Sequence, residues 1–171
     1  MKPTLRSLLV AVLLAAVSLS VQAGALTDYA ENQLIDYIFR AQASGLPSTW
    51  YVALYTTCPT DSSAGTEVTN AGSYARVSAG ANGLTVWAGT QSAGSTTAST
   101  GTNGTTSNNN VISFATATGT WGTINCWGLV DSGTYGGGHL WVYTAVTTPP
   151  TITSGATPSF AAAAMTFQID N

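Results

Sequence analysis

From Ser48 to the end of the chain, apolar and polar side chains alternate in short runs, which is the pattern of β-strands. The runs are rich in aromatic and β-branched residues, and clusters of glycine, proline and asparagine separate them. About seven or eight such runs follow one another, with no helical period between them. We therefore predict an all-β fold, an antiparallel β-sandwich of a jelly-roll-like kind, in place of a parallel α/β fold.

Two of these runs allow more detailed predictions. Residues 50–55 are apolar on both alternating faces, which predicts a central strand that is covered on both sides. If residues 121–130 form one strand, alternate side chains share a face, and the face shared by Trp121 and Trp127 also carries Thr123 and Asn125.

A single helix is predicted ahead of the strands, over residues 28–43. Asp28, with Glu31 three residues later, can cap its first free N–H groups, and Gly45 and Pro47 mark its end. Because its apolar residues recur at helical spacing on one side only, we expect this helix to pack against one face or one end of a sheet.

Residues 1–23 have the three-part layout of a secretory signal peptide. Lys2 and Arg6 precede an apolar run, and a site with small residues ends at Ala23. The apolar run is shorter than the ~20 residues that span a bilayer, so we predict cleavage and no stable membrane span after processing. A retained N-terminal anchor is the alternative. After cleavage, residues 24–171 would form one domain.

The chain carries few charges. Only 6% of its residues are charged, against ~25% in typical soluble domains. The net charge of −3 would become −5 after the two cations of the leader are removed, and such a chain has no means of binding nucleic acid through counterion release. Weak repulsion between copies favours a homo-oligomer or filament, and a monomer with a neutral exterior is the alternative.

The two cysteines, Cys58 and Cys126, allow one disulfide in an exported chain. Two buried free thiols are the alternative, because free cysteine is among the residues most often buried. His139 is the only histidine and no C-x-x-C motif occurs, so neither a metal centre nor a cofactor is predicted.

Residues suited to catalysis are scarce. His139 is the only candidate base for a nucleophilic triad, and no G-x-S-x-G motif is present. Helix capping and turn formation account for most of the acidic residues, so no carboxylate pair of the glycosidase kind is indicated. We predict that the chain is not an enzyme.

Residues 90–110, TQSAGSTTASTGTNGTTSNNN, are uncharged and lie between two predicted strands. They are too polar to be buried, which predicts a long surface loop. Such a loop is a plain connection, a contact with a neighbouring subunit, or a ligand-binding segment. Its candidate contact residues are Thr90, Thr97, Thr105 and Asn108.

Tryptophans offer a second kind of contact. All five lie in predicted strands, where packing in the core is their usual role. Trp121 and Trp127 are the candidate pair for an exposed platform that stacks on a surface glycan. A carbohydrate-binding module is therefore one of the alternative functions.

Two long segments carry a family resemblance. The first contains ALTDYAENQLIDYIF, YVALYTTCPTD and GSYARV, and the second contains VISFATATGTWGTINCWGLVDSGTYGGGHLWVYTAV and SFAAAAMTFQID. Together they resemble small phage proteins known as tail fibre or virion structural proteins. The resemblance implies a noncatalytic, β-rich virion subunit, in a tail fibre or as a capsid decoration, that contacts copies of itself or other virion proteins. It transfers no active-site residues.

The leader and the enlarged stretch at 90–110 depart from that family pattern. The resemblance implies a location in the virion, whereas the leader predicts export to the cell surface or the medium. An exported, self-assembling filament or adhesion subunit of phage-like ancestry is therefore the alternative that accommodates both features.

Overall fold

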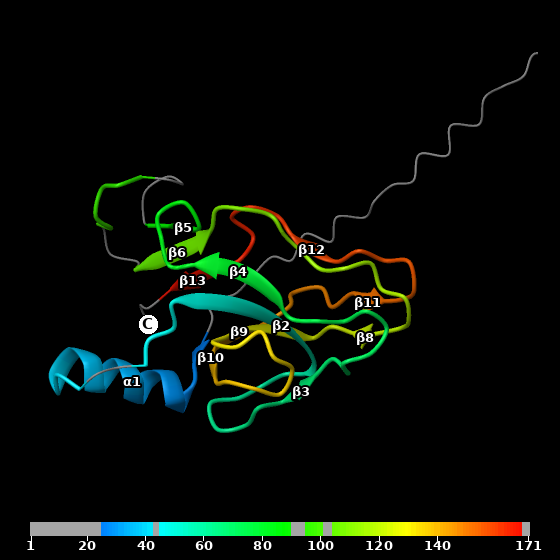
Figure 1. The fold of residues 1–171 in the computed structure, drawn as a ribbon, viewed down its shortest axis with the longest axis horizontal. Coiled ribbons are helices and arrows are strands. Elements are labelled where there is room, and N and C mark those ends of the chain that lie inside the picture. Colours follow the sequence, from blue (N-terminus) through cyan, green and yellow to red (C-terminus); the bar gives the residue numbers. More distant parts are fainter. Residues whose placement is uncertain (1–24, 43–44, 90–94, 101–103, 169–171) are drawn as a thin grey trace, which may run out of the picture.

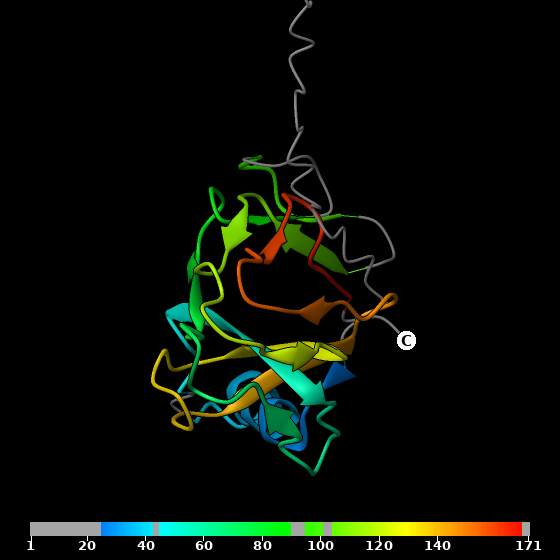
Figure 2. The same ribbon diagram turned by 90° about the vertical axis from the view of Figure 1, so that its right-hand side faces the viewer.

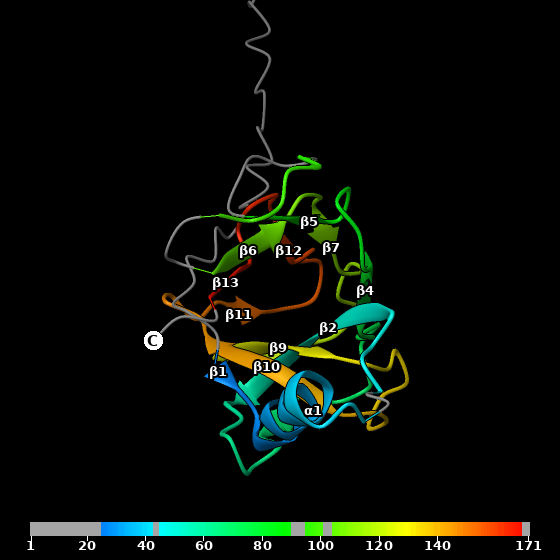
Figure 3. The ribbon, with the colours of Figure 1, turned by 90° about the vertical axis from the view of Figure 1, so that its left-hand side faces the viewer.

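A computed structural model describes residues 25–42, 45–89, 95–100 and 104–168. This part of the chain contains short antiparallel strands and one helix (Figure 1), which confirms the predicted all-β, sandwich-like class. The predicted signal peptide lies outside the described residues. Figures 2 and 3 show two layers of strands, seen from opposite sides, with the helix beyond one of them.

The lower layer in Figure 3 is the main sheet, whose strand order is β1-β10-β9-β2-β3, with β4 also paired to β2. Its strands are β1 (Ala25–Leu26), β2 (Thr49–Thr57), β3 (Thr66–Glu67), β4 (Val77–Ala81), β9 (Cys126–Val130) and β10 (Leu140–Ala145).

The second layer is built from small antiparallel groups of strands, β5-β6-β13, β7-β12 and β8-β11. Its strands are β5 (Trp87–Ala88), β6 (Thr105–Asn108), β7 (Ile112–Ser113), β8 (Gly122–Thr123), β11 (Thr151–Ile152), β12 (Ser159–Phe160) and β13 (Thr166–Gln168).

Strand β2 is the centre of the main sheet, as predicted for residues 50–55. It pairs with β9 along one edge and with β3 and β4 along the other. Val52 and Leu54 belong to the core between the layers, while Ala53 and Tyr55 pack in a smaller cluster on the opposite face. Both faces are buried, which explains why this run is apolar at every position.

The core between the layers is rich in aromatic rings. Trp127 meets the rings of Phe160 and Phe167 edge-on, with centroid distances of 5.7 and 5.3 Å. Each such pair contributes about 0.5–1.5 kcal/mol beyond the burial of its area. Because β9 supplies Trp127 while β12 and β13 supply the two phenylalanines, these contacts join the two layers.

Residues 121–130 do not form the single strand that alternation predicts. Gly122–Thr123 is β8 of the second layer and Cys126–Val130 is β9 of the main sheet, so the chain passes from one layer to the other at Ile124 and Asn125. Asn125 supports this crossing, because its side-chain Nδ2 donates to the carbonyl of Thr56, at 2.6 Å. Because the chain changes layers here, the alternation of side chains in β8 does not predict which face the side chains of β9 share.

Helix α1 (Asp28–Phe39) begins with a different cap from the predicted one. Thr27 is the N-cap: its Oγ1 accepts a hydrogen bond from the N–H of Ala30 (3.3 Å) and donates one to the carbonyl of Leu140 (2.7 Å). The cap therefore also ties the start of the helix to β10. Asp28 is the first helical residue, where its negative charge still favours the positive end of the helix dipole.

The helix ends earlier than predicted, at Phe39. Ala41 has a left-handed backbone conformation, with φ of 49°. The N–H groups of Arg40 and Gln42 both donate to the carbonyl of Asp36, at 3.3 and 3.1 Å. This hydrogen-bonded turn stops the helix before Gly45 and Pro47 are reached.

The stretch at 90–110 is not one continuous loop, because Thr105–Asn108 forms β6 between β5 and β13. Threonine is β-branched and fits a half-buried strand. Pairing on both sides satisfies the backbone groups of β6, so its polar composition does not prevent strand formation. The described residues 95–100 contain no strand.

Candidate functional site

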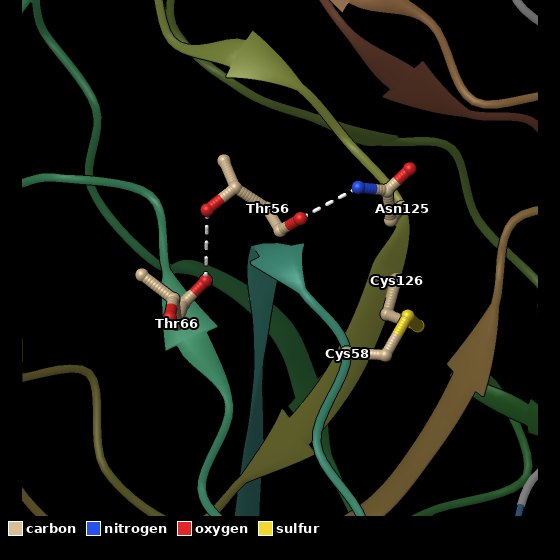
Figure 4. The surroundings of a disulfide bond; sticks show 5 residues. All are labelled: Thr56, Cys58, Thr66, Asn125 and Cys126. Carbon is tan, nitrogen blue, oxygen red and sulfur yellow. Dashed lines mark hydrogen bonds between the residues drawn. A yellow bond between two sulfur atoms is a disulfide. The ribbon is translucent and has the colours of Figure 1, made fainter.

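Cys58 and Cys126 form a disulfide, with their Cα atoms 5.2 Å apart, so the two cysteines are not free thiols. Figure 4 shows the bridge beside two hydrogen bonds of Thr56, whose Oγ1 donates to the carbonyl of Thr66 (3.3 Å) and whose carbonyl accepts from Asn125 (2.6 Å). The covalent bond thus lies where β2, β3 and β9 meet.

The polar cluster around Asp131 contains His139, the candidate base. Asp131 Oδ1 accepts a hydrogen bond from the backbone N–H of His139 (2.6 Å), and Oδ2 accepts one from the indole N–H of Trp141 (3.1 Å). His139 Nδ1 lies 3.3 Å from Oδ2, and its ring stacks on that of Tyr29, with centroids 4.0 Å apart. Gly138 is needed here: its φ is 69°, and a Cβ would collide with Asp131 Oδ1.

The carboxylate of Asp131 acts as an acceptor that closes the turn over residues 131–139. Burial raises the pKa of Asp131, but the hydrogen bonds from the His139 backbone, Trp141 and the His139 ring outweigh it, and the pKa lies below its ordinary value of 3.8. His139 contacts the carboxylate and the backbone N–H of Asp131 and the ring of Tyr29, and these contacts point to a role in holding the turn against α1.

We expect acid to weaken this turn. A carboxylate whose pKa is lowered by folding contributes stability above the unfolded pKa, and that stability is lost as the pH falls through the folded pKa. Melting temperatures measured from neutral pH to about pH 2 should show Asp131→Asn less stable than wild type at neutral pH, with the difference narrowing below about pH 3.8. Asp36→Asn, which removes a half-buried carboxylate of α1 that pairs with Arg40, is the control. A constant difference across the pH range would contradict the assignment.

Arg76 also holds the turn over residues 131–139. Its Nε and Nη2 donate to the carboxylate of Glu67, at 2.9 and 2.8 Å. Its Nη1 donates to the carbonyls of Ser132, Thr134 and Gly137, at 2.9, 2.9 and 2.8 Å. Burial lowers the pKa of the guanidinium, but the contacts with Glu67 outweigh this and raise it above its ordinary value. Arg76 is therefore occupied as a structural cation.

The prediction that Trp121 and Trp127 form an exposed platform is wrong. Trp121 and Trp127 are 6% and 0% exposed, and both belong to the core cluster. The indole N–H of Trp121 donates to the carbonyl of Gly72, at 2.8 Å. Because the chain crosses between layers after β8, the two rings enter the core from different layers, and neither offers a face to a glycan.

The other candidate contact residues are not brought together. Asn108 is buried: its Nδ2 donates to the carbonyls of Asn110 and Ala161, and its Oδ1 accepts from the N–H of Met165, all at 2.8 Å. Thr105 is half-buried at the start of β6, and Thr97 is exposed. Thr90 lies outside the described residues.

The described residues hold little that could bind a small ligand. Within them, no cluster of three or more His, Cys, Asp or Glu side chains could coordinate a metal ion. A cavity of about 20 Å³ lies between the layers, lined by residues that include Leu54, Ile152 and Phe160, and it has room for no more than a water. In the same described ranges, no helix has the length and apolar character to cross a membrane.

The apolar side of α1 is more exposed than the sequence predicts. The apolar stripe of the helix was expected to pack against a sheet, but only the N-terminal part does so, through Ala30 and Tyr29. Ile35, Ile38 and Phe39 are 49%, 61% and 80% exposed. Figure 1 shows the C-terminal end of α1 pointing away from the strands, and Figure 3 shows the helix outside the main sheet.

Comparisons with known proteins agree with the resemblance noted in the sequence. The family model described as Podophage GP4 fiber I protein gp80 matches residues 25–168. The match begins at β1 and ends at the last residue of β13, so it covers every strand described above. Comparison with curated protein sequences gives no significant match.

Proposed function

Because the chain belongs to the family of podophage GP4 fiber I protein gp80, we propose that it is a noncatalytic structural subunit of a phage tail fibre. The family match over residues 25–168 carries this proposal, and it makes the chain a structural phage protein. The description of the family as a fibre protein favours a place in a fibre over a capsid decoration.

The surface of the described fold suits such a role. Exposed hydroxyl groups are hydrogen-bonded in pairs between distant segments: Ser73 with Thr118 at 2.9 Å, and Thr116 with Thr157 at 2.8 Å. Thr123 and Thr151 form a third pair, at 2.8 Å. A neutral exterior of this kind gives little long-range repulsion between neighbouring subunits, so it allows close packing in an assembly.

An exported filament or adhesion subunit is the second candidate, favoured by the predicted leader at residues 1–23. The Cys58–Cys126 bridge also favours passage through an oxidising compartment, where disulfides form and persist. The carbohydrate-binding alternative has lost its main support, because Trp121 and Trp127 are buried.

Mass spectrometry of purified virions and of sheared cell-surface material distinguishes the two candidates. We expect peptides from residues 25–168 in virions that have been freed of host protein by density gradient. Recovery from surface material alone would favour the exported filament, and absence from both fractions would contradict both. A peptide whose N-terminus is Gly24 would show that the leader is cleaved, in whichever fraction it occurs.

A further inference from the structure

The first described residues form an N-terminal arm, Ala25–Phe39, which consists of β1, the N-cap Thr27 and α1. β1 is an edge strand of the main sheet, where it pairs with two residues of β10. Ala30 is the one buried residue of α1, and the side chain that α1 packs against β10 is Tyr29, in its first turn. The arm is therefore held to the rest of the fold, the body, through its first few residues and along one edge.

The surface that receives the arm is built from β10 and the residue before it. The N–H of Thr27 donates to the carbonyl of Trp141 (3.0 Å), and its Oγ1 donates to the carbonyl of Leu140 (2.7 Å). The ring of Tyr29 stacks on that of His139 and meets that of Trp141 edge-on, with centroid distances of 4.0 and 5.4 Å. All of these contacts join the arm to the body, so the identical arm of a second copy satisfies the same surface.

The hinge between the arm and the body is strained. Ala41 has a φ of 49°, a left-handed conformation that is unfavourable for a residue with a Cβ. The sequence at 40–43, RAQA, consists of good helix formers, and the helix predicted from the sequence includes it, yet α1 ends at Phe39. The local sequence therefore favours a continued helix over the turn at Ala41 that connects the arm to its own body.

We propose that two copies of this protein exchange their N-terminal arms, so that β1 of each copy pairs with β10 of the other. Each arm keeps in the other copy the contacts that it makes in its own, which makes exchange a low-cost route to a dimer. Strained hinges favour it, because opening the hinge releases Ala41 from its left-handed conformation. The inference deepens the proposed function and rests on it, because a subunit of a fibre must contact further subunits and exchanged arms supply one such contact.

Mixing two variants that each add one cysteine tests the exchange. Leu26 and Val142 lie opposite each other, next to the hydrogen-bonded pair of Thr27 and Trp141. They therefore form a pair without mutual hydrogen bonds, whose Cα atoms lie about 4.5 Å apart and can be bridged by a disulfide. Leu26→Cys and Val142→Cys are exported separately with the leader so that the native disulfide forms, then mixed at millimolar concentration, warmed and mildly oxidised. We expect a covalent dimer with one copy of each variant, because neither chain alone can form this bridge.

Leu26→Cys mixed with Val111→Cys is the matched control for random collision, since Val111 is exposed in the second layer. We expect no covalent dimer in that mixture. If Leu26→Cys and Val142→Cys give no covalent dimer, or give no more than the control mixture does, the arms are not exchanged and the proposal is overturned.

Light scattering and sedimentation test the hinge. We expect wild type to reach the mass of a dimer at millimolar concentration. Ala41→Gly should raise the Kd of the dimer about thirtyfold, because glycine adopts the left-handed conformation without strain and each of the two hinges contributes about fivefold. Ala163→Gly is the matched control: Ala163 has a φ of 61° but lies between β12 and β13 of the second layer, so the Kd should not change.

A wild-type monomer at every concentration, or a dimer whose Kd is the same for wild type and Ala41→Gly, would overturn the exchange at this hinge. The failure of this inference is distinguishable from that of the proposed function. Recovery of the chain from virions without any exchange of arms would refute this contact alone, whereas exchange in a protein that is absent from virions would refute only the proposed function.

Discussion

Replacing both Cys58 and Cys126 by serine is expected to lower the free energy of unfolding by about 4 kcal/mol. The bridge joins residues that are 68 positions apart, and a cross-link over a loop of this length removes much conformational entropy from the unfolded chain. For a domain of this size, the loss corresponds to a fall of roughly 10–15 °C in melting temperature. Urea unfolding followed by tryptophan fluorescence measures the free energy, and calorimetry measures the melting temperature.

Reduction supplies the control for this experiment. A reducing agent should destabilise wild type by a similar amount and leave the double serine variant unchanged. The double serine variant also keeps Asn125, whose side chain donates to the Thr56 carbonyl next to the site. If oxidised and reduced wild type unfold at the same urea concentration, the bridge does not stabilise this fold.

Arg76→Met is expected to cost about 3–5 kcal/mol of stability. The side chains of Arg76 and Glu67 are only 5% and 11% exposed, so removing the guanidinium leaves a nearly buried carboxylate without its partner. It also removes the donor to three carbonyls of the turn over residues 131–139. Tyr74, whose hydroxyl donates to Glu67, retains one of the contacts of that carboxylate.

Two comparisons make this prediction specific. Arg40→Met removes the partner of Asp36 in an exposed pair of α1, and there we expect a change below about 0.5 kcal/mol. The double variant Arg76→Met with Glu67→Leu should recover part of the loss, because it leaves no buried charge behind. Chemical unfolding of wild type, Arg76→Met, Glu67→Leu and the double variant gives the coupling energy of the buried pair. A loss for Arg76→Met no larger than that for Arg40→Met would refute the structural role of the cation.

The fold class and the central strand could be predicted from local sequence alone. Alternation with a period of two identifies strands wherever one face is buried, and the fully apolar run at β2 identifies a strand with two buried faces. The helix was recognisable by its spacing, although its cap belongs to Thr27, whose hydroxyl is also held by the Leu140 carbonyl, 113 positions away. Thr27 and Asp28 are both common N-cap residues, and the bond to a distant carbonyl that favours Thr27 cannot be read from the local sequence.

Alternation failed where the chain changes layers. Residues 121–130 keep a strand-like pattern across Ile124 and Asn125, because each half contributes large side chains to the same core from opposite sides. The polar strand β6 was missed for a related reason: its stability comes from pairing with β5 and β13, which are distant in sequence. The disulfide, too, could be stated only as one of two alternatives until the positions of Cys58 and Cys126 were known.

The sequence by itself determined the β-rich class, the single helix, the neutral surface and the family, since all of these follow from composition and from patterns within short segments. Only the tertiary structure decided which apolar faces are buried. An apolar stripe shows that a helix requires a partner, but the partner is set by how distant strands pair and where the sheet ends. In this protein α1 packs against β10 through Tyr29 and Ala30 in its first turn, and Ile35, Ile38 and Phe39 remain exposed.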